Sequence, residues 1–121
     1  MLVVEDHPTL RRLLVTALQE RGYRVIEAQD GLAAIHVIEQ HDPPASHLCL
    51  ILLDLMLPVI NGLELMAALT EHLVGVPIVA ISGNAEYLDQ ATVVGATATL
   101  AKPFELSKLL ALVGQYCSGR D

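Results

Sequence analysis

The sequence predicts an α/β domain in which five parallel strands form an open, doubly wound sheet with helices on both faces. Short apolar segments of strand length alternate with segments of helical spacing along the chain. Three of the short segments are almost wholly apolar, which is typical of strands buried on both faces. Because parallel strand-helix-strand units cross over with one hand, strict alternation builds one covered sheet. The expected strands are 2–4, 24–28, 48–53, 76–81 and 98–101.

Helix signals lie between and after these strands. Pro8 suits the first turn of a helix that Gly22 ends, and Asp30 suits the N-cap of a helix over 31–40. The apolar stripe of the first helix is expected on Leu10, Leu13, Leu14, Ala17 and Leu18. The other helices are expected from Asn61 or Gly62, from Asn84 to Gly95, and from Glu105 to Tyr116.

Length and composition narrow the classes of function. The chain has 121 residues, so we expect a single domain over 1–121 with one core. Seven Lys and Arg against 14 Asp and Glu give a net charge of −7, the wrong sign for a surface that neutralises nucleic-acid phosphates. The hydrophobic content of 53% argues against disorder. We therefore expect a folded domain that does not bind nucleic acid directly.

The sequence also favours a cytoplasmic location. Asp54 and Pro58 interrupt the most apolar stretch, 48–60, which is too short for a membrane span. The first residues do not have the pattern of a secretory signal. Cys49 and Cys117 lie far apart without C-x-x-C spacing, so we expect two buried, reduced thiols.

Acidic, hydroxyl or basic residues stand directly after four of the expected strands. They are Glu5 and Asp6 after the first strand, Asp54 after the third, Ser82 after the fourth and Lys102 after the fifth. Ligands of open parallel sheets bind outside the carboxyl ends of the strands, so these side chains are expected to converge. Each residue alone could be a helix cap or a solvated charge, but their joint placement at strand ends favours a functional site.

The residue types at this edge indicate phosphoryl chemistry. Asp54 follows an apolar run, where an unpaired charge is costly, and Glu5 and Asp6 add repulsion unless a divalent cation joins the three. Mg²⁺ is the cation that prefers such oxygen ligands together with phosphate. Lys102 supplies a counter-charge for a phosphoryl group, Asp54 can accept that group as a nucleophile, and Ser82 can donate a hydrogen bond to it.

Three sequence motifs surround these residues. They are Val3-Val4-Glu5-Asp6, Leu52-Leu53-Asp54-Leu55-Met56-Leu57-Pro58 with Asn61-Gly62, and Leu100-Ala101-Lys102-Pro103-Phe104. With these motifs the whole chain resembles the receiver domain of two-component response regulators, of the chemotaxis-regulator type. The resemblance implies a flavodoxin-like fold with strand order 2-1-3-4-5. It also implies that Glu5, Asp6, Asp54 and the backbone carbonyl of Met56 bind Mg²⁺, and that a cis peptide bond joins Lys102 to Pro103.

The resemblance further implies that Asp54 receives its phosphoryl group from a histidine kinase or a histidine phosphotransfer protein. Thr99 stands where many receivers have an aromatic switch residue, so an aromatic switch is not expected. Met56 and Asn84 occupy positions that in the family tune the access of attacking water. The segment from the fourth to the fifth helix carries few charges, which disfavours a salt-bridged dimer and favours a monomer or weak dimer.

Two other functions compete with a phosphorylation switch acting on an output domain or effector protein. The first is a pseudo-receiver that only binds partners; the intact set of Glu5, Asp6, Asp54, Ser82 and Lys102 argues against it. The second is an aspartate-nucleophile phosphatase, which would need an acid two residues after the nucleophile, where Met56 stands. We therefore expect a signalling domain rather than an enzyme.

Overall fold

The computed structural model describes residues 1–40, 48–58, 60–72 and 75–117. In these residues, five parallel strands form one sheet in the order β2-β1-β3-β4-β5, which confirms the predicted fold class. The strands are β1 (Leu2–Val4), β2 (Ile26–Ala28), β3 (Ile51–Asp54), β4 (Ile78–Ser82) and β5 (Ala98–Ala101). The helices are α1 (Pro8–Glu20), α2 (Gly31–Gln40), α3 (Gly62–His72), α4 (Ala85–Val94) and α5 (Leu106–Tyr116).

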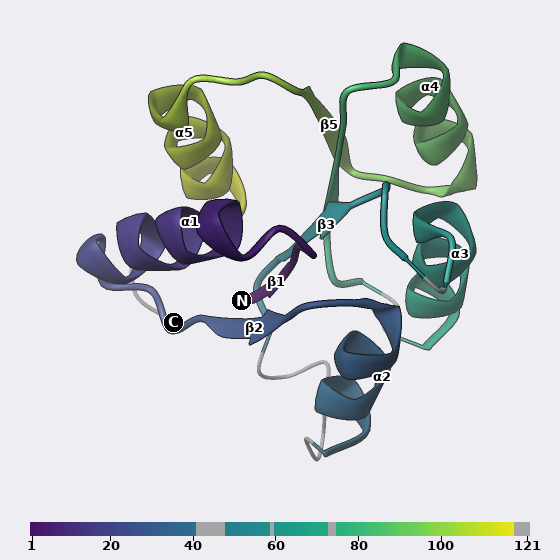
Figure 1. The fold of residues 1–121 in the computed structure, drawn as a ribbon, viewed down its shortest axis with the longest axis horizontal. Helices are drawn as coiled ribbons and strands as arrows, with labels where there is room; N and C mark the ends of the chain where they lie inside the picture. Colours follow the sequence, from purple (N-terminus) through teal and green to yellow (C-terminus); the bar gives the residue numbers. More distant parts are fainter. Residues whose placement is uncertain (41–47, 59, 73–74, 118–121) are drawn as a thin grey trace.

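The sheet separates two helical layers. Figure 1 shows α1 and α5 on one side of the strands and α2, α3 and α4 on the other. Alternate residues of a strand enter different cores: Leu2 and Val4 pack toward α2, α3 and α4, whereas Val3 packs toward α1 and α5. This alternation follows from the two-residue repeat of a strand, and it explains why central strands must be apolar on both faces.

Local signals set the helix ends as predicted. Pro8 lies in the first turn of α1, the Asp30 side chain accepts a hydrogen bond from the Ala33 amide at 2.8 Å, and the backbone turns with positive φ at Gly22 and Gly95. Proline fits the first turn because its missing N–H has no partner there, and glycine fits these left-handed positions at no steric cost. Among the described helices, none combines the length and apolar character needed to cross a bilayer.

Two central strands extend one residue further than the sequence indicates. Asp54 and Ser82 are the last residues of β3 and β4 rather than the first residues after them. The reason is continued ladder pairing, since Asp54 is in register with Ile81 and Ser82 with Ala101. Both functional candidates are therefore held by sheet hydrogen bonds rather than by flexible loop backbone.

The expectation that Leu13 belongs to the buried stripe of α1 is wrong. Its exposed fraction is 53%, whereas Leu14 and Leu18 are buried. The buried residues of α1 are Leu14, Val15 and Leu18, so the face of the helix that packs on the sheet is rotated toward Val15 and away from Leu13.

The expectation of two reduced thiols is also contradicted. Cys49, just before β3, forms a disulfide with Cys117, which ends α5, across a sequence separation of 68 residues. The fold brings their Cα atoms to 5.6 Å, a separation that suits a disulfide. Sequence spacing could not indicate this pair, because the contact depends on α5 returning along the sheet to the start of β3.

Replacing Cys49 by Ser is expected to lower the free energy of unfolding by about 2–4 kcal/mol under non-reducing conditions, because the cross-link restricts the unfolded chain. Urea denaturation followed by circular dichroism measures the change. A reductant should bring the wild type to the stability of the variant and leave the variant unchanged; a wild type insensitive to reductant would contradict a stabilising bond.

Candidate functional site

The carboxyl ends of neighbouring strands bring three acidic side chains together. Glu5 and Asp6 follow β1, and Asp54 ends the adjacent parallel strand β3. One carboxylate oxygen from each residue lies within 4.8 Å of the others. Glu5 and Asp54 are buried and Asp6 is exposed, so the cluster opens to solvent on the Asp6 side. The convergence that the sequence indicated is thus present.

Lys102 reaches the same cluster from the end of β5. Its Nζ donates hydrogen bonds to Asp54 Oδ2 at 3.1 Å and to Glu5 Oε1 at 3.3 Å. The side chains of Glu5 and Asp54 are only 2% and 3% exposed, compared with 29% for Lys102. A buried carboxylate without a partner is costly, so the ammonium is the charge that allows both acids to be buried. The peptide bond from Lys102 to Pro103 is cis, as the family resemblance implied.

Burial and neighbouring charge act against each other in this cluster. Burial raises the pKa of Glu5 to about 7, and Asp54 adds to the rise, while the His7 amide and Lys102 act to lower it. Burial also acts to lower the pKa of Lys102, but the hydrogen bonds and negative charges of Asp54 and Glu5 outweigh it and raise that pKa. Lys102 is therefore a firmly charged group, and added positive charge beside Glu5 would favour its ionised form.

The loop after β3 fixes the orientation of Asp54. Oδ1 of Asp54 accepts a hydrogen bond from the Met56 amide at 2.9 Å, while Oδ2 faces Lys102. The loop then returns so closely that the Gly62 amide donates to the Leu55 carbonyl at 3.2 Å. A Cβ atom at position 62 would lie 2.4 Å from the Leu55 Cα and carbonyl oxygen, so only glycine fits. Gly62 therefore allows the chain to pack closely against Leu55, next to Asp54, while the Asn61 side chain accepts a hydrogen bond from the Leu63 amide in the first turn of α3.

Ser82 connects the site to the start of α4. Its buried Oγ accepts a hydrogen bond from the Asn84 amide at 3.0 Å, and its carbonyl accepts one from the Lys102 amide at 2.9 Å. The Asn84 side chain in turn caps α4 by accepting from the amides of Glu86 and Tyr87. Ser82 thus lies at the strand edge as expected, with its hydroxyl oriented by the same residue that begins α4.

A cavity of about 270 Å³ opens beside the acidic cluster. Its lining includes Asp6, Met56, Asn61 and Tyr87. Tyr87 is an aromatic side chain near the site that the sequence analysis did not assign to it. Its position three residues after the N-cap Asn84, on the helix that follows β4, is the signal that could have found it. Thr99, where an aromatic switch would stand, is exposed on β5.

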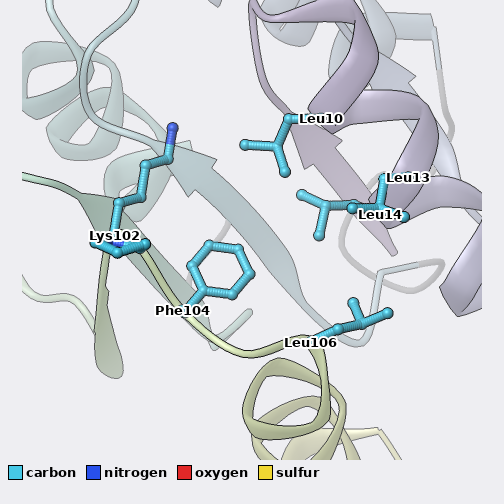
Figure 2. A pocket seen from close by; sticks show the side chains of 7 residues that line it. Leu10, Leu13, Leu14, Lys102, Phe104 and Leu106 are labelled. Carbon is cyan, nitrogen blue, oxygen red and sulfur yellow. The ribbon is translucent and has the colours of Figure 1, made fainter.

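An apolar groove of about 480 Å³ adjoins Lys102 on the other helical layer. Its lining residues are Leu10, Leu13, Leu14, Lys102, Pro103, Phe104 and Leu106. Figure 2 shows the leucines of α1 on one side and Phe104 and Leu106, from the connection into α5, on the other. The exposed Leu13 thus contributes to a groove that also includes Lys102, which contacts the acidic cluster. The groove was not predicted from the sequence, where Leu13 was expected only as a member of the apolar stripe of α1.

Comparison with known proteins identifies the family. A family model described as the response regulator receiver domain matches residues 1–114. The chain belongs to this family. A probable transcriptional regulatory protein of Picosynechococcus is 36% identical over 115 residues, which cover 92% of this chain and 46% of that protein. The transcriptional regulatory protein TcrA of Mycobacterium tuberculosis is 35% identical over 113 residues, covering 92% of this chain and 43% of its own length.

Solved receiver structures have the same fold. The receiver domain of NtrX from Brucella abortus superimposes with a TM-score of 0.85 at 28% identity and covers 95% of both chains. The response regulator TrrA of Thermotoga maritima, solved with Mg²⁺ and BeF, gives a TM-score of 0.83 at 27% identity and covers 96% of both chains. The present receiver spans about half the length of the curated relatives it matches.

Proposed function

We propose that residues 1–121 form one receiver domain that accepts a phosphoryl group on Asp54 from a histidine kinase or a histidine phosphotransfer protein. The observation that carries this proposal is the contact of Lys102 with the buried carboxylates of Asp54 and Glu5, at 3.1 and 3.3 Å. A nucleophilic carboxylate, an adjacent ammonium and further acids are the groups that phosphoryl transfer to aspartate requires. The domain promotes its own phosphorylation and dephosphorylation rather than turning over a separate substrate.

The donor set of the acidic cluster fits Mg²⁺. Glu5, Asp6 and Asp54 offer hard oxygen ligands within 4.8 Å of one another, and the backbone carbonyl of Met56 would add a fourth. Exposure of Asp6 leaves a side open for water and for phosphoryl oxygens. Bound Mg²⁺ supplies positive charge that neutralises the phosphoryl oxygens during transfer.

The chain's own residues account for the remaining chemistry. A carboxylate oxygen of Asp54 forms a bond to phosphorus as the bond from phosphorus to the donor's imidazole nitrogen breaks, and the electron pair stays on that nitrogen. The carboxylate is itself the nucleophile, so no general base is needed. Lys102, which already contacts Asp54 at 3.1 Å, pairs with the phosphoryl oxygens.

Ser82 links the phosphoryl group to the protein surface. Its hydroxyl donates to a phosphoryl oxygen. The same hydroxyl oxygen accepts a hydrogen bond from the amide of Asn84, which is the N-cap residue of α4. A change at Ser82 is therefore transmitted to the face formed by α4 and α5, which shifts between two populations. With the exposed Thr99 on β5, this transmission proceeds without an aromatic switch at that position.

The two rival functions have less support. The pseudo-receiver has less support because the groups that phosphoryl transfer to Asp54 needs are present, and Lys102 contacts both Asp54 and Glu5. For a phosphatase, Met56 stands where the second acid would be needed, and its side chain is exposed and apolar.

The output belongs to another segment or another protein. The net charge of −7 disfavours direct nucleic-acid binding by this domain, which acts as a monomer or weak dimer on an output domain or effector. We assign it to the cytoplasm, where a kinase partner has access to it.

The phosphoryl donor docks in the apolar groove beside Lys102. The imidazole of the donor must approach Asp54. Lys102 lines the groove and also contacts Asp54, so a donor bound in the groove would lie next to the acceptor. Leu10, Leu13 and Phe104 offer apolar surface for a helix of the kinase or phosphotransfer protein that carries the phosphohistidine. The groove thus shares Lys102 with the site of transfer.

Incubation with Mg²⁺ and acetyl phosphate is expected to add one phosphoryl group, detected by intact mass spectrometry. Asp54→Asn should take up none, because an amide is not a comparable nucleophile. Removal of Mg²⁺ with a chelator should abolish the addition in the wild type. An adduct that persists in Asp54→Asn would exclude Asp54 as the acceptor, an absent adduct would favour the pseudo-receiver, and multiple turnover of an unrelated phosphate ester would favour the phosphatase.

Leu13→Glu is expected to slow phosphoryl transfer from a phosphorylated histidine kinase about tenfold, because the interface would bury an unpaired charge. The rate with phosphoramidate, which needs no docking, should not change. Leu32→Glu is the matched control, because Leu32 on α2 is 57% exposed, close to the 53% of Leu13. Radiolabel transfer measures these rates; equal slowing by both variants would refute docking in the groove.

A further inference from the structure

Arg11 binds the backbone that carries the acidic pair. This residue of α1 donates a hydrogen bond from Nη1 to the Glu5 carbonyl oxygen at 2.8 Å. Its Nε donates to Glu27 Oε1, on β2, at 3.0 Å. The Arg11 side chain is only 15% exposed. A planar guanidinium can make both bonds at once, so Arg11 fixes the position of the Glu5 carbonyl relative to β2.

The Glu5 backbone is held on both sides by these contacts. Its amide donates to the Ala28 carbonyl of β2 at 3.0 Å, and its carbonyl accepts from Arg11. The carbonyl of Glu5 and the amide of Asp6 belong to one planar peptide group. A fixed Glu5 carbonyl therefore also fixes the orientation of the peptide group that carries the Asp6 amide. Arg11 thus contacts the peptide group that joins the two acids but neither of their carboxylates.

We propose that Arg11 is a positioning residue for the cation site, holding Glu5 and Asp6 in the arrangement that binds Mg²⁺. This inference rests on the proposed function, since it assumes that the acidic cluster binds the cation. Without Arg11 the peptide group between the two acids gains freedom, and ordering it again opposes binding. The positive charge of Arg11 is paired with Glu27, so its effect on the cation comes chiefly from geometry.

Arg12 provides a matched control within the same helix turn. It contacts the same Glu27 carboxylate at 3.4 Å but is 67% exposed. In the described part of the chain, Arg12 has this contact and no hydrogen bond to the Glu5 backbone. Comparing variants at positions 11 and 12 therefore separates the bond to Glu5 from the loss of a positive charge near Glu27.

The test is titration of the ¹⁵N-labelled chain with Mg²⁺, followed through the NMR shifts of the Asp6 and Asp54 amides. Arg11→Ala is expected to raise the Mg²⁺ dissociation constant about tenfold, the usual scale for residues that orient metal ligands. Arg11→Lys should weaken binding to a similar degree, since an ammonium keeps the charge but not the two-pronged geometry. Arg12→Ala should stay within about twofold of the wild type.

The outcomes separate the possible explanations. A charge effect alone would tighten binding in Arg11→Ala and leave Arg11→Lys like the wild type, and either result overturns the proposal. Equal weakening by Arg11→Ala and Arg12→Ala also overturns it. Thermal unfolding without Mg²⁺ checks that the variants fold. If Arg11→Ala does not fold, the Mg²⁺ titration of Arg11→Lys alone tests the proposal. If the wild type shows no Mg²⁺-dependent shifts, the proposed cation site itself is wrong, which is distinct from failure at Arg11 alone.

Discussion

The structure depends on one ammonium group placed between two buried carboxylates. Asp54 ends β3 and Glu5 follows β1, so the parallel sheet brings two acids together where neither has access to water. Burial, together with the neighbouring Asp54, opposes ionisation of Glu5 and raises its pKa to about 7. Lys102 offsets this cost from the end of the edge strand β5, and the two acids raise the pKa of Lys102 itself. Two acids therefore share one ammonium, and a further positive charge beside them would favour the ionised form of Glu5.

Contacts of Lys102 connect the acidic cluster with two parts of the protein surface. Through the Lys102 and Asn84 amides, Ser82 joins the acidic cluster to the start of α4. On the opposite layer, Lys102 forms one end of the groove between α1 and Phe104 (Figure 2). Under the proposed function, a phosphoryl group that binds Lys102 and Ser82 would act on two surfaces: the groove where its donor is proposed to dock, and the start of α4.

Much of this arrangement could be predicted from sequence, because periodicity and topology determine it. Near-continuous apolar strands imply a parallel sheet, and such a sheet gathers whatever stands at its carboxyl ends, so Glu5, Asp54 and Lys102 were found together. Contacts that depend on helix placement were not predictable. Cys117 meets Cys49 only because α5 returns to the start of β3, and Arg11 reaches Glu5 only through its side-chain conformation. Periodicity shows which residues share a face of α1, but not that the buried face is rotated toward Val15 and leaves Leu13 exposed.

The most direct test of the central claim is the pKa of Glu5 with and without the ammonium, measured by carboxyl ¹³C NMR titration in the absence of Mg²⁺. Lys102→Met keeps the length of the side chain and removes its charge. Lys102 lowers the pKa of Glu5, which lies at about 7 in the wild type, so the variant should titrate at distinctly higher pH. An unchanged midpoint, or a lower one, would contradict the claim that Lys102 is the charge that allows these acids to be buried together.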